Sequence, residues 1–275
     1  MALSKKQIEL VENTIRTSLR NRFATYNPEP AVMPFHTRLL GKDRLALYSF
    51  IHSLNTNFGT TIFEPVAVAL ASTHFKVAKR QTKSGTQIST KAQFEIQKIM
   101  DNLTSAITKP DKEKEIGIIR EVCQIGEMRT VKPTRVDVYL ESNNNEIYLI
   151  DIKTAKPNKG GFKEFKRTLL EWTAVTLAKN PNAKINTLIA IPYNPYEPKP
   201  YSRWTMAGML DLDNELKVAE EFWDFLGGKG AYNDLLGCFE RVGIELRDEI
   251  DKYFSRFKNK WPYQTKCISH CVASG

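Results

Sequence analysis

The chain has 275 residues, enough for one large domain or two small ones. Hydrophobic residues make up 41% and charged residues 26%, which is typical of a globular protein, and no apolar run approaches the ~20 residues of a membrane span. The net charge of +9 favours a polyanionic partner such as nucleic acid, because Lys and Arg gain affinity by neutralising phosphates. No apolar stretch follows the basic start, so we expect an intracellular protein without a signal peptide.

The four cysteines show no spacing that predicts disulfide pairing. Three residues near the end, Cys267, His270 and Cys271, lie close enough in sequence to suggest a metal clip. A structural zinc site usually has four ligands, however, and no second cluster supplies the fourth. We therefore expect the last residues to form a frayed tail, with the metal clip as the alternative.

Helical periodicity dominates the first half of the chain. Ser4 and Gln7 predict a capping box at the start of a helix, which a turn-rich stretch at 27–30 ends. The apolar stripe of this helix consists of Ile8, Val11, Ile15 and Leu19. Further helices are predicted, in chain order, at 43–54, 60–71, 89–106 and 112–123, with a break at 55–59 between the first two.

From Val136 onwards, apolar and polar residues alternate, and the helical period is no longer seen. Residues 136–140 and 147–152 are predicted strands, and the turn formers between them indicate a β-hairpin. A helix at 162–178 and a buried strand at 184–191 follow, which favours a crossover in a mixed sheet. After a proline-rich loop, helices are predicted at 214–226 and 231–254. We expect one α/β domain with helical flanks.

Two acids and a lysine are expected to meet on this hairpin. Side chains alternate between faces along a strand, so Asp151 and Lys153 point the same way. If the loop holds an odd number of residues, for example 142–146, Glu141 opposes Ile147 and, counting back, Asp137 opposes Asp151. Directly opposed residues have Cβ atoms roughly 5 Å apart.

Two carboxylates at that distance repel each other, and a divalent cation is one reason to keep them together. Mg²⁺ binds one or two carboxylates and keeps positions open for water and a substrate phosphate. Lys153 could orient or deprotonate the attacking water and stabilise charge on the phosphate. The pattern predicts Mg²⁺-dependent phosphodiester hydrolysis. The alternative is an exposed ion pair between Lys153 and Asp151, since D-x-K triplets are common.

A basic run follows the triplet and leads into a predicted helix N-terminus, where phosphate oxygens bind readily. Between 153 and 167 the only acid is Glu164. The basic residues of the run are Lys153, Lys156, Lys159, Lys163, Lys166 and Arg167. We expect the wall of a phosphate channel here, although such runs are usually just solvated faces.

The arrangement Asp137…Asp151-Ile152-Lys153 resembles the PD-(D/E)xK nuclease signature, except that Pro133 lies four residues before the first acid. Longer segments are similar to the TdeIII family of type II restriction endonucleases: 33–44, 53–71, 151–172, 190–212 and 220–230. The resemblance reaches about residue 257. It implies one restriction-endonuclease-like domain over 1–257, with a catalytic core at about 55–195, a helical recognition and dimerisation region at 196–257, and a tail at 258–275.

The resemblance implies a cytoplasmic, prokaryotic, site-specific deoxyribonuclease that works as a homodimer on double-stranded DNA. It implies hydrolysis of both strands at a short pseudo-palindromic, GGNCC-like site, with 5′-phosphate ends. A cognate DNA methyltransferase is implied genetically, without being a stable partner. The implied cofactor is Mg²⁺, with Asp137, Asp151, Ile152 and Glu64 as ligands, and the implied catalytic residues are Asp137, Asp151, Lys153 and Glu64.

Base-reading residues are harder to predict, although Arg and Lys most often read guanine edges. Candidate DNA contacts are Lys156, Lys159, Lys163, Arg38, Lys42, Arg203 and Arg135. Glu64 could equally form an ion pair on a helix face. Two other functions remain open: a repair or junction-resolving nuclease on the same fold, and a basic DNA-binding module without activity, which would have no need of two acids facing a lysine.

Overall fold

The structure, a computed structural model, describes residues 2–25, 34–153 and 159–258. Within these ranges no helix is long and apolar enough to cross a membrane. The elements in chain order are α1 (Lys5–Thr25), α2 (Pro34–Leu40), α3 (Lys42–Phe58), a π-helical turn (Gly59–Phe63), α4 (Glu64–Ala71), β1 (Val77–Lys83), β2 (Gln87–Ser89), α5 (Thr90–Thr104), α6 (Lys112–Val122), β3 (Met128–Thr130), β4 (Arg135–Glu141), β5 (Glu146–Ile152), a 3₁₀ turn (Lys159–Gly161), α7 (Phe162–Lys179), β6 (Lys184–Ile191), a 3₁₀ turn (Arg203–Met206), β7 (Leu216–Val218), α8 (Glu220–Gly227), α9 (Ala231–Glu245) and α10 (Arg247–Lys258).

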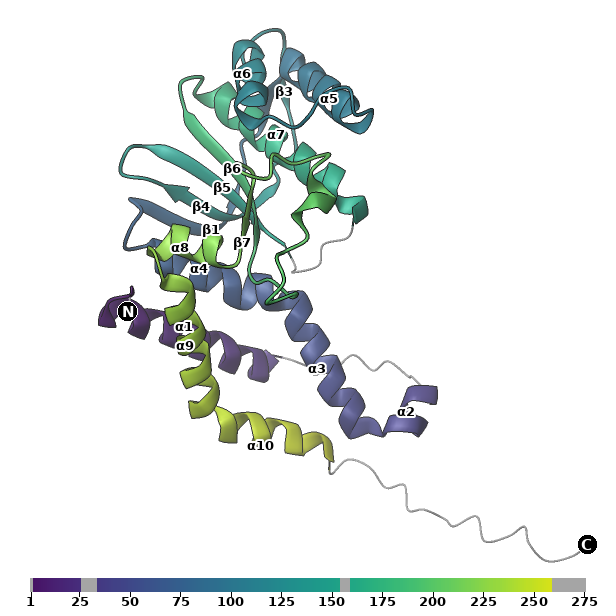
Figure 1. Cartoon of the computed structure of the whole chain (residues 1–275), viewed down its shortest axis with the longest axis vertical. Coiled ribbons are helices and arrows are strands. Elements are labelled where there is room, and N and C mark those ends of the chain that lie inside the picture. The colour runs from purple at the N-terminus through teal and green to yellow at the C-terminus, as the bar shows by residue number, and fades with distance from the viewer. Residues whose placement is uncertain (1, 26–33, 154–158, 259–275) are drawn as a thin grey trace, which may run out of the picture.

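Five strands form one mixed sheet in the order β1-β4-β5-β6-β7 (Figure 1). The pairs β1–β4 and β4–β5 are antiparallel, whereas β5–β6 and β6–β7 are parallel. Helix α7 makes the crossover between β5 and β6, since parallel neighbours need a long connection. The predicted hairpin, crossover and mixed sheet are therefore confirmed. Strands β2 and β3 pair separately as a small antiparallel sheet.

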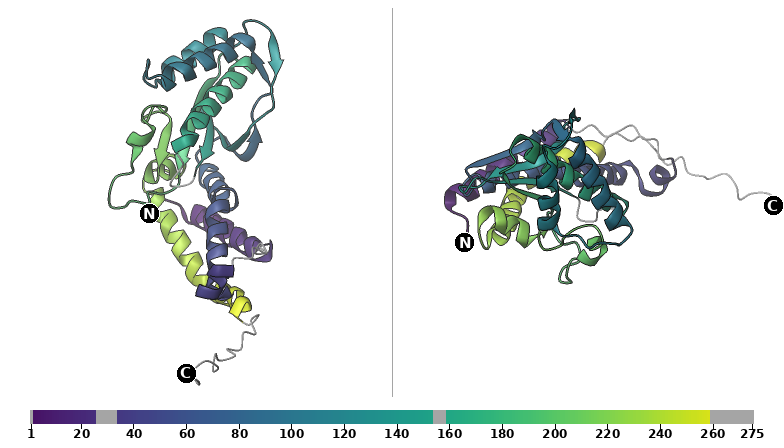
Figure 2. Two further views of the ribbon diagram at one scale, coloured as in Figure 1. Left: turned by 90° about the vertical axis from the view of Figure 1, so that its right-hand side faces the viewer. Right: turned by 90° about the horizontal axis from the view of Figure 1, so that it is seen from above.

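Helices cover both faces of the sheet. Helices α5, α6 and α7 pack on one face around Leu149, Trp172 and Ile189. Helices α1, α4, α8 and α9 pack on the other, where Ile150 and Trp223 are buried. The sheet with α5–α7 makes up one end of an elongated molecule, and α1, α3, α9 and α10 make up the other (Figures 1 and 2).

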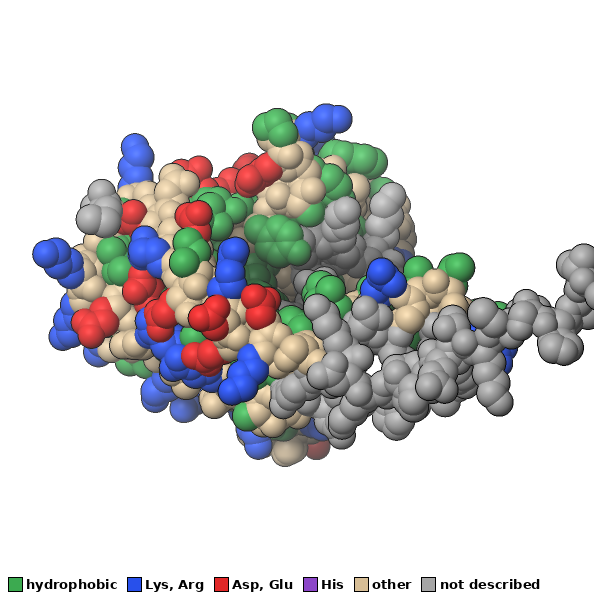
Figure 3. All heavy atoms as spheres, turned by 90° about the horizontal axis from the view of Figure 1, so that it is seen from below, with side chains coloured by type: hydrophobic (Ala, Val, Ile, Leu, Met, Phe, Trp, Pro, Cys, Tyr) green, Lys and Arg blue, Asp and Glu red, His purple; other side chains and the backbone are tan. Residues whose placement is uncertain are grey.

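Helix α1 begins with the predicted capping box. The amide of Ser4 donates to Oε1 of Gln7 over 2.9 Å, and the amide of Gln7 donates to Oγ of Ser4 over 3.3 Å. Three ion pairs then join the outer face of α1 to α9 and α10: Arg16–Glu245, Arg20–Glu249 and Glu12–Arg241. Seen from below, basic and acidic side chains intermingle over much of the molecule (Figure 3).

Three predicted elements are corrected by the structure. The expected break at 55–59 is absent, because α3 continues through the π-helical turn into α4. The expected helix at 214–226 is replaced by strand β7 and the shorter helix α8, since Leu216–Val218 pairs with the end of β6. The expected helix at 231–254 is two helices that meet at Leu246. The region 196–257 thus contributes a strand as well as helices.

Strands β1, β2 and β3 were not predicted. Strand β1 lies at the edge of the sheet, and its middle residues are exposed on both sides, so it lacks the alternation that marks a half-buried strand. Strands β2 and β3 have three residues each, too few for any period. In α5, the predicted helix that follows β2, Phe94 is 63% exposed and lies outside the buried stripe.

Candidate active site

The β4–β5 hairpin has the register that the sequence predicts. Glu141 pairs with Ile147, and the pairing runs back to Val138 and Ile150. The next opposed pair in this register is Asp137 with Asp151. The amide of Ser142 donates to the carbonyl of Glu146 over 2.9 Å and closes the loop. Both acids therefore lie on the same face of the sheet.

Asp137, Asp151 and Lys153 are held by short contacts at the end of β5. The amide of Ile152 donates to Oδ2 of Asp137 over 2.9 Å. Nζ of Lys153 lies 2.7 Å from Oδ2 of Asp151 and 4.7 Å from the centre of the Phe165 ring. Lys153 is thus held between a carboxylate and an aromatic face.

The two acids are poorly solvated. Asp151 is 8% exposed. Burial and then the negative charge of Asp151 raise the pKa of Asp137 to about 7, with a smaller contribution from Glu64 and against the hydrogen bond from Ile152. Like charges brought together in a buried place disfavour the ionised state. The site is therefore set to bind positive charge.

Glu64 is the third acid of this centre. Its side chain is 1% exposed, and Oε1 accepts a hydrogen bond from Nη2 of Arg135 over 2.7 Å. Its other oxygen, Oε2, is buried and has no hydrogen-bond partner among the described residues. Nε of Arg135 also lies 3.6 Å from Oδ1 of Asp137. Arg135 therefore bridges Glu64 and Asp137.

The helix geometry at Glu64 departs from a regular α-helix. The next residue, Pro65, cannot donate a backbone hydrogen bond, and a proline ring inside a helix crowds the carbonyl four residues back. The amide of Glu64 accordingly donates to the carbonyl of Gly59, one residue further back than in an α-helix. Such π-helical turns are frequent at functional sites.

A pocket of about 720 Å³ opens beside the acids. Glu64, Asp137 and Lys153 line one part of it. Aromatic and aliphatic side chains, among them Phe58, Phe63, Tyr193, Trp223 and Phe239, line the rest. The low polarity of these walls strengthens electrostatic interactions at the acids, because little water screens them.

Comparison with known proteins identifies the family. The family model described as "Type II restriction endonuclease, HinfI" matches residues 3–243. The chain belongs to this family. The type II restriction enzyme MjaII of Methanocaldococcus jannaschii is 30% identical, over 96% of this chain and 76% of MjaII. HgiCII of Herpetosiphon aurantiacus is 26% identical, over 83% of this chain and 84% of HgiCII. HgiEI of the same organism is 27% identical, over 79% of each chain.

The chain is therefore a type II restriction enzyme, a hydrolase that acts on DNA. Its sequence motifs had pointed to the TdeIII family, and the matching family model is that of HinfI. The resemblance is confirmed at the level of type II restriction endonucleases. The alternative of a DNA-binding module without activity does not agree with this membership.

Restriction endonucleases are typically metal-dependent, and the donor set of this HinfI-family chain suits a hard cation. Asp137, Asp151 and Glu64 offer carboxylate oxygens, and one oxygen of Glu64 is an orphan. In the described part of the chain, however, no three or more His, Cys, Asp or Glu residues gather closely enough to hold a metal ion. The acids fit Mg²⁺ chemically, with two of them opposed and the third paired to Arg135.

The predicted DNA contacts lie in different parts of the structure. Arg38 and Lys163 are exposed on α2 and α7. Arg203 is paired with Glu221 over 2.6 Å. The alternative metal clip of Cys267, His270 and Cys271 lies outside the described residues. Lys156 lies outside them too, as do the side chains of Lys42 and Lys159. The roles of these residues in DNA binding stay predictions.

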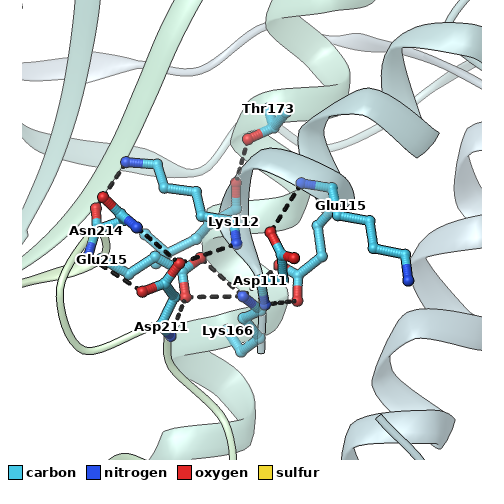
Figure 4. Close-up of polar contacts among 10 residues, drawn as sticks. Asp111, Lys112, Glu115, Lys166, Thr173, Asp211, Asn214 and Glu215 are labelled. Atoms are coloured by element: carbon cyan, nitrogen blue, oxygen red, sulfur yellow. Dashed lines mark hydrogen bonds and ion pairs between the residues drawn. The ribbon is translucent and has the colours of Figure 1, made fainter. Parts of the chain in front are cut away.

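One residue of the basic run does not face a channel. Lys166 is fully buried and forms ion pairs with Glu115 and with Glu215, the latter at 2.7 Å (Figure 4). The expectation that it lines a phosphate channel was wrong. Phe162, Lys166, Leu169 and Thr173 recur at helical spacing on the buried face of α7, and this pattern could have located Lys166 in the core.

Proposed function

We propose that this restriction enzyme is Mg²⁺-dependent and hydrolyses both strands of duplex DNA at a short pseudo-palindromic, GGNCC-like site. The products would carry 5′-phosphate ends. The observation that carries the proposal is the β4–β5 register, which pairs Val138 with Ile150 and, continued by one residue, brings Asp137 opposite Asp151, with Lys153 in contact with the second acid. The arrangement resembles the PD-(D/E)xK signature, which combines a metal site with a nearby amine.

The metal ligands in this proposal are the carboxylates of Asp137, Asp151 and Glu64 and the main-chain carbonyl of Ile152. When bound, Mg²⁺ supplies a Lewis acid that lowers the pKa of bound water and neutralises phosphate charge. Lys153 acts from the Asp151 side: its Nζ can hold or orient the attacking water and stabilise charge on the phosphate. The apolar pocket walls keep bulk water away from these groups.

DNA would enter along the basic residues near the site. We propose that Lys156, Lys159 and Lys163 contact the backbone next to the scissile phosphate, because they follow the catalytic triplet directly in the chain. Arg38, Lys42 and Arg203 would extend the contact surface or read base edges. In this division the core at 55–195 carries the chemistry, and 196–257 serves recognition and dimerisation.

We propose a homodimer because each chain supplies a single cutting centre. One chain contributes one Asp137–Asp151–Lys153 group, whereas cutting both strands symmetrically needs two. Exposed apolar side chains on α2 and α3 supply a surface for the second copy: Phe35 is 81% exposed, Leu39 83% and Tyr48 62%. Leu39→Asp should lower the mass measured by light scattering to that of a single chain. An unchanged mass would exclude this surface as the dimer contact.

The test of the proposed function is digestion of a plasmid of known sequence with Mg²⁺ and with EDTA. Wild type should give discrete fragments only with Mg²⁺, and their mapped ends give the site. Lys153→Ala should lower the rate by about 10²–10³, as for loss of one preorganised charge donor. Lys184→Ala is the matched control, because Lys184 is exposed at the start of β6. A smear instead of fragments, or cutting that persists in EDTA, would contradict the proposal.

A further inference from the structure

Arg135 contacts two of the proposed metal ligands, Glu64 and Asp137. Its guanidinium donates to Glu64 over 2.7 Å and lies 3.6 Å from Asp137, while its own side chain is 47% exposed. Glu64 is 1% exposed and keeps one oxygen without a partner among the described residues. The negative charge of the buried Glu64 is therefore neutralised by Arg135, a side chain that water can reach.

The positive charges of the centre are divided between the acids. Lys153 neutralises Asp151, and Arg135 is shared by Glu64 and Asp137. With these pairs made, the described acids do not gather into a three-ligand metal cluster. A metal ion that used Glu64 and Asp137 would have to compete with the guanidinium.

We propose that Arg135 is a substrate-released clamp, a positioning residue that keeps Glu64 and Asp137 neutralised until a DNA phosphate draws the guanidinium away. The proposal rests on the metal site proposed above. Three observations support it: the guanidinium is exposed enough to reach a phosphate, its partners are both metal-ligand candidates, and guanidinium forms bidentate hydrogen bonds with phosphate as readily as with carboxylate. No covalent step is involved.

The clamp would couple DNA binding to completion of the metal site. Without DNA, Arg135 lowers the negative charge felt by an incoming ion. When DNA is bound, Arg135 pairs with a phosphate instead. The carboxylate of Glu64 is then left free beside Asp137. The enzyme would then bind its metal tightly only where a phosphate is already seated.

The first test measures metal binding without DNA, by electron paramagnetic resonance of free and bound Mn²⁺. Arg135→Gln should bind Mn²⁺ more tightly than wild type, by about fivefold or more. Arg129→Ala, which removes an exposed arginine from the separate small sheet, should leave binding unchanged. Equal or weaker Mn²⁺ binding by Arg135→Gln would overturn the clamp.

The same titration separates the clamp from the metal site on which it rests. Asp137→Asn should weaken Mn²⁺ binding if the proposed site is right. If Asp137→Asn has no effect, the metal site itself is wrong. If Asp137→Asn weakens binding and Arg135→Gln does not tighten it, the site stands and only the clamp is refuted.

The second test needs no metal. In EDTA, the affinity of the protein for an intact labelled duplex that contains the recognition site is measured at several salt concentrations. Glu64→Gln should raise DNA affinity by about fivefold or more, because Arg135 is already released. The double variant Glu64→Gln/Arg135→Gln should show no such gain, and the magnitude of its salt slope should fall by about one. The double variant also leaves no buried carboxylate at position 64 without a counter-charge. A gain that persists without Arg135 would refute the clamp.

Discussion

The amide nitrogen of Ile152 lies 2.9 Å from Oδ2 of Asp137, so the last residue of β5 fixes the first acid of the site. That contact holds Asp137 where the sheet register also brings Asp151. The pKa of Asp137 is raised to about 7, chiefly by burial and then by the charge of Asp151. The fold thus maintains a charge arrangement that costs stability when no cation is bound.

Asp137→Asn should therefore lower activity and raise stability. The amide keeps an acceptor for Ile152 while it removes the charge that Asp151 repels. At pH 8 in EDTA we expect a gain of about 1–3 kcal/mol in the free energy of unfolding, and a loss of cutting of more than about a hundredfold. Urea unfolding and plasmid digestion measure the two effects. A variant that is less stable than wild type would show that this charge does not strain the fold.

Phe165 should position Lys153, the proposed catalytic amine. Its ring lies 4.7 Å from Nζ of Lys153, a cation–π contact worth about 0.5–1 kcal/mol at an exposed site. Phe165→Leu should slow cutting about two- to fivefold, because Lys153 loses one of its two constraints. Phe94→Leu is the control, since Phe94 is exposed on α5. An unchanged single-turnover rate would assign the positioning to Asp151 alone.

Lys166→Met should destabilise the protein strongly. The amine is fully buried between Glu115 and Glu215, and its removal leaves two buried carboxylates without their ion-pair partner, at a cost of about 3–5 kcal/mol. Replacing all three residues with apolar ones should recover most of this loss. Arg16→Ala, which breaks an exposed pair with Glu245, should cost less than about 1 kcal/mol. Similar losses of unfolding free energy in Lys166→Met and Arg16→Ala would mean that burial does not decide how much these ion pairs contribute.

The sequence was most informative where local rules act. The Ser4–Gln7 capping box and the odd loop of the hairpin each depend on residues a few positions apart, and both gave the right geometry. Strand β6 was placed at 184–191 because a continuous apolar run indicates a buried strand. The opposition of Asp137 and Asp151 followed from parity alone.

The features that were missed depend on contacts between distant segments. Strand β7 exists because three residues pair with the end of β6, and no period distinguishes three residues from a helix start. The pairing of Glu64 with Arg135 joins two elements far apart in the chain. Lys166 was misplaced because a charge count ignores helix phase, which a buried ion pair obeys. Tertiary packing decides β7 and the Glu64–Arg135 pair, whereas the helix phase of Lys166 could be followed in the sequence.

Lys112 gives the protein a stability that depends on pH in the alkaline range. Its amine is mostly buried and donates to the carbonyl of Asn214 over 2.8 Å. Burial lowers its pKa to about 8, against the opposing effect of nearby acids. The charged groups that affect it are Glu215, Asp211, Lys166 and Lys217. A lysine with a lowered pKa binds fewer protons in the folded state than in the unfolded state.

The sign of the pH effect follows from that difference. Below pH 8 Lys112 is charged in both states, and the buried charge costs stability; between pH 8 and the ordinary pKa of 10.5 this cost is relieved. Lys112→Met has no such group. The stability of wild type relative to Lys112→Met should therefore rise by roughly 1–3 kcal/mol from pH 8 to pH 10. Urea unfolding of both proteins at several pH values measures it, and a difference that falls or stays constant would mean that Lys112 keeps an ordinary pKa.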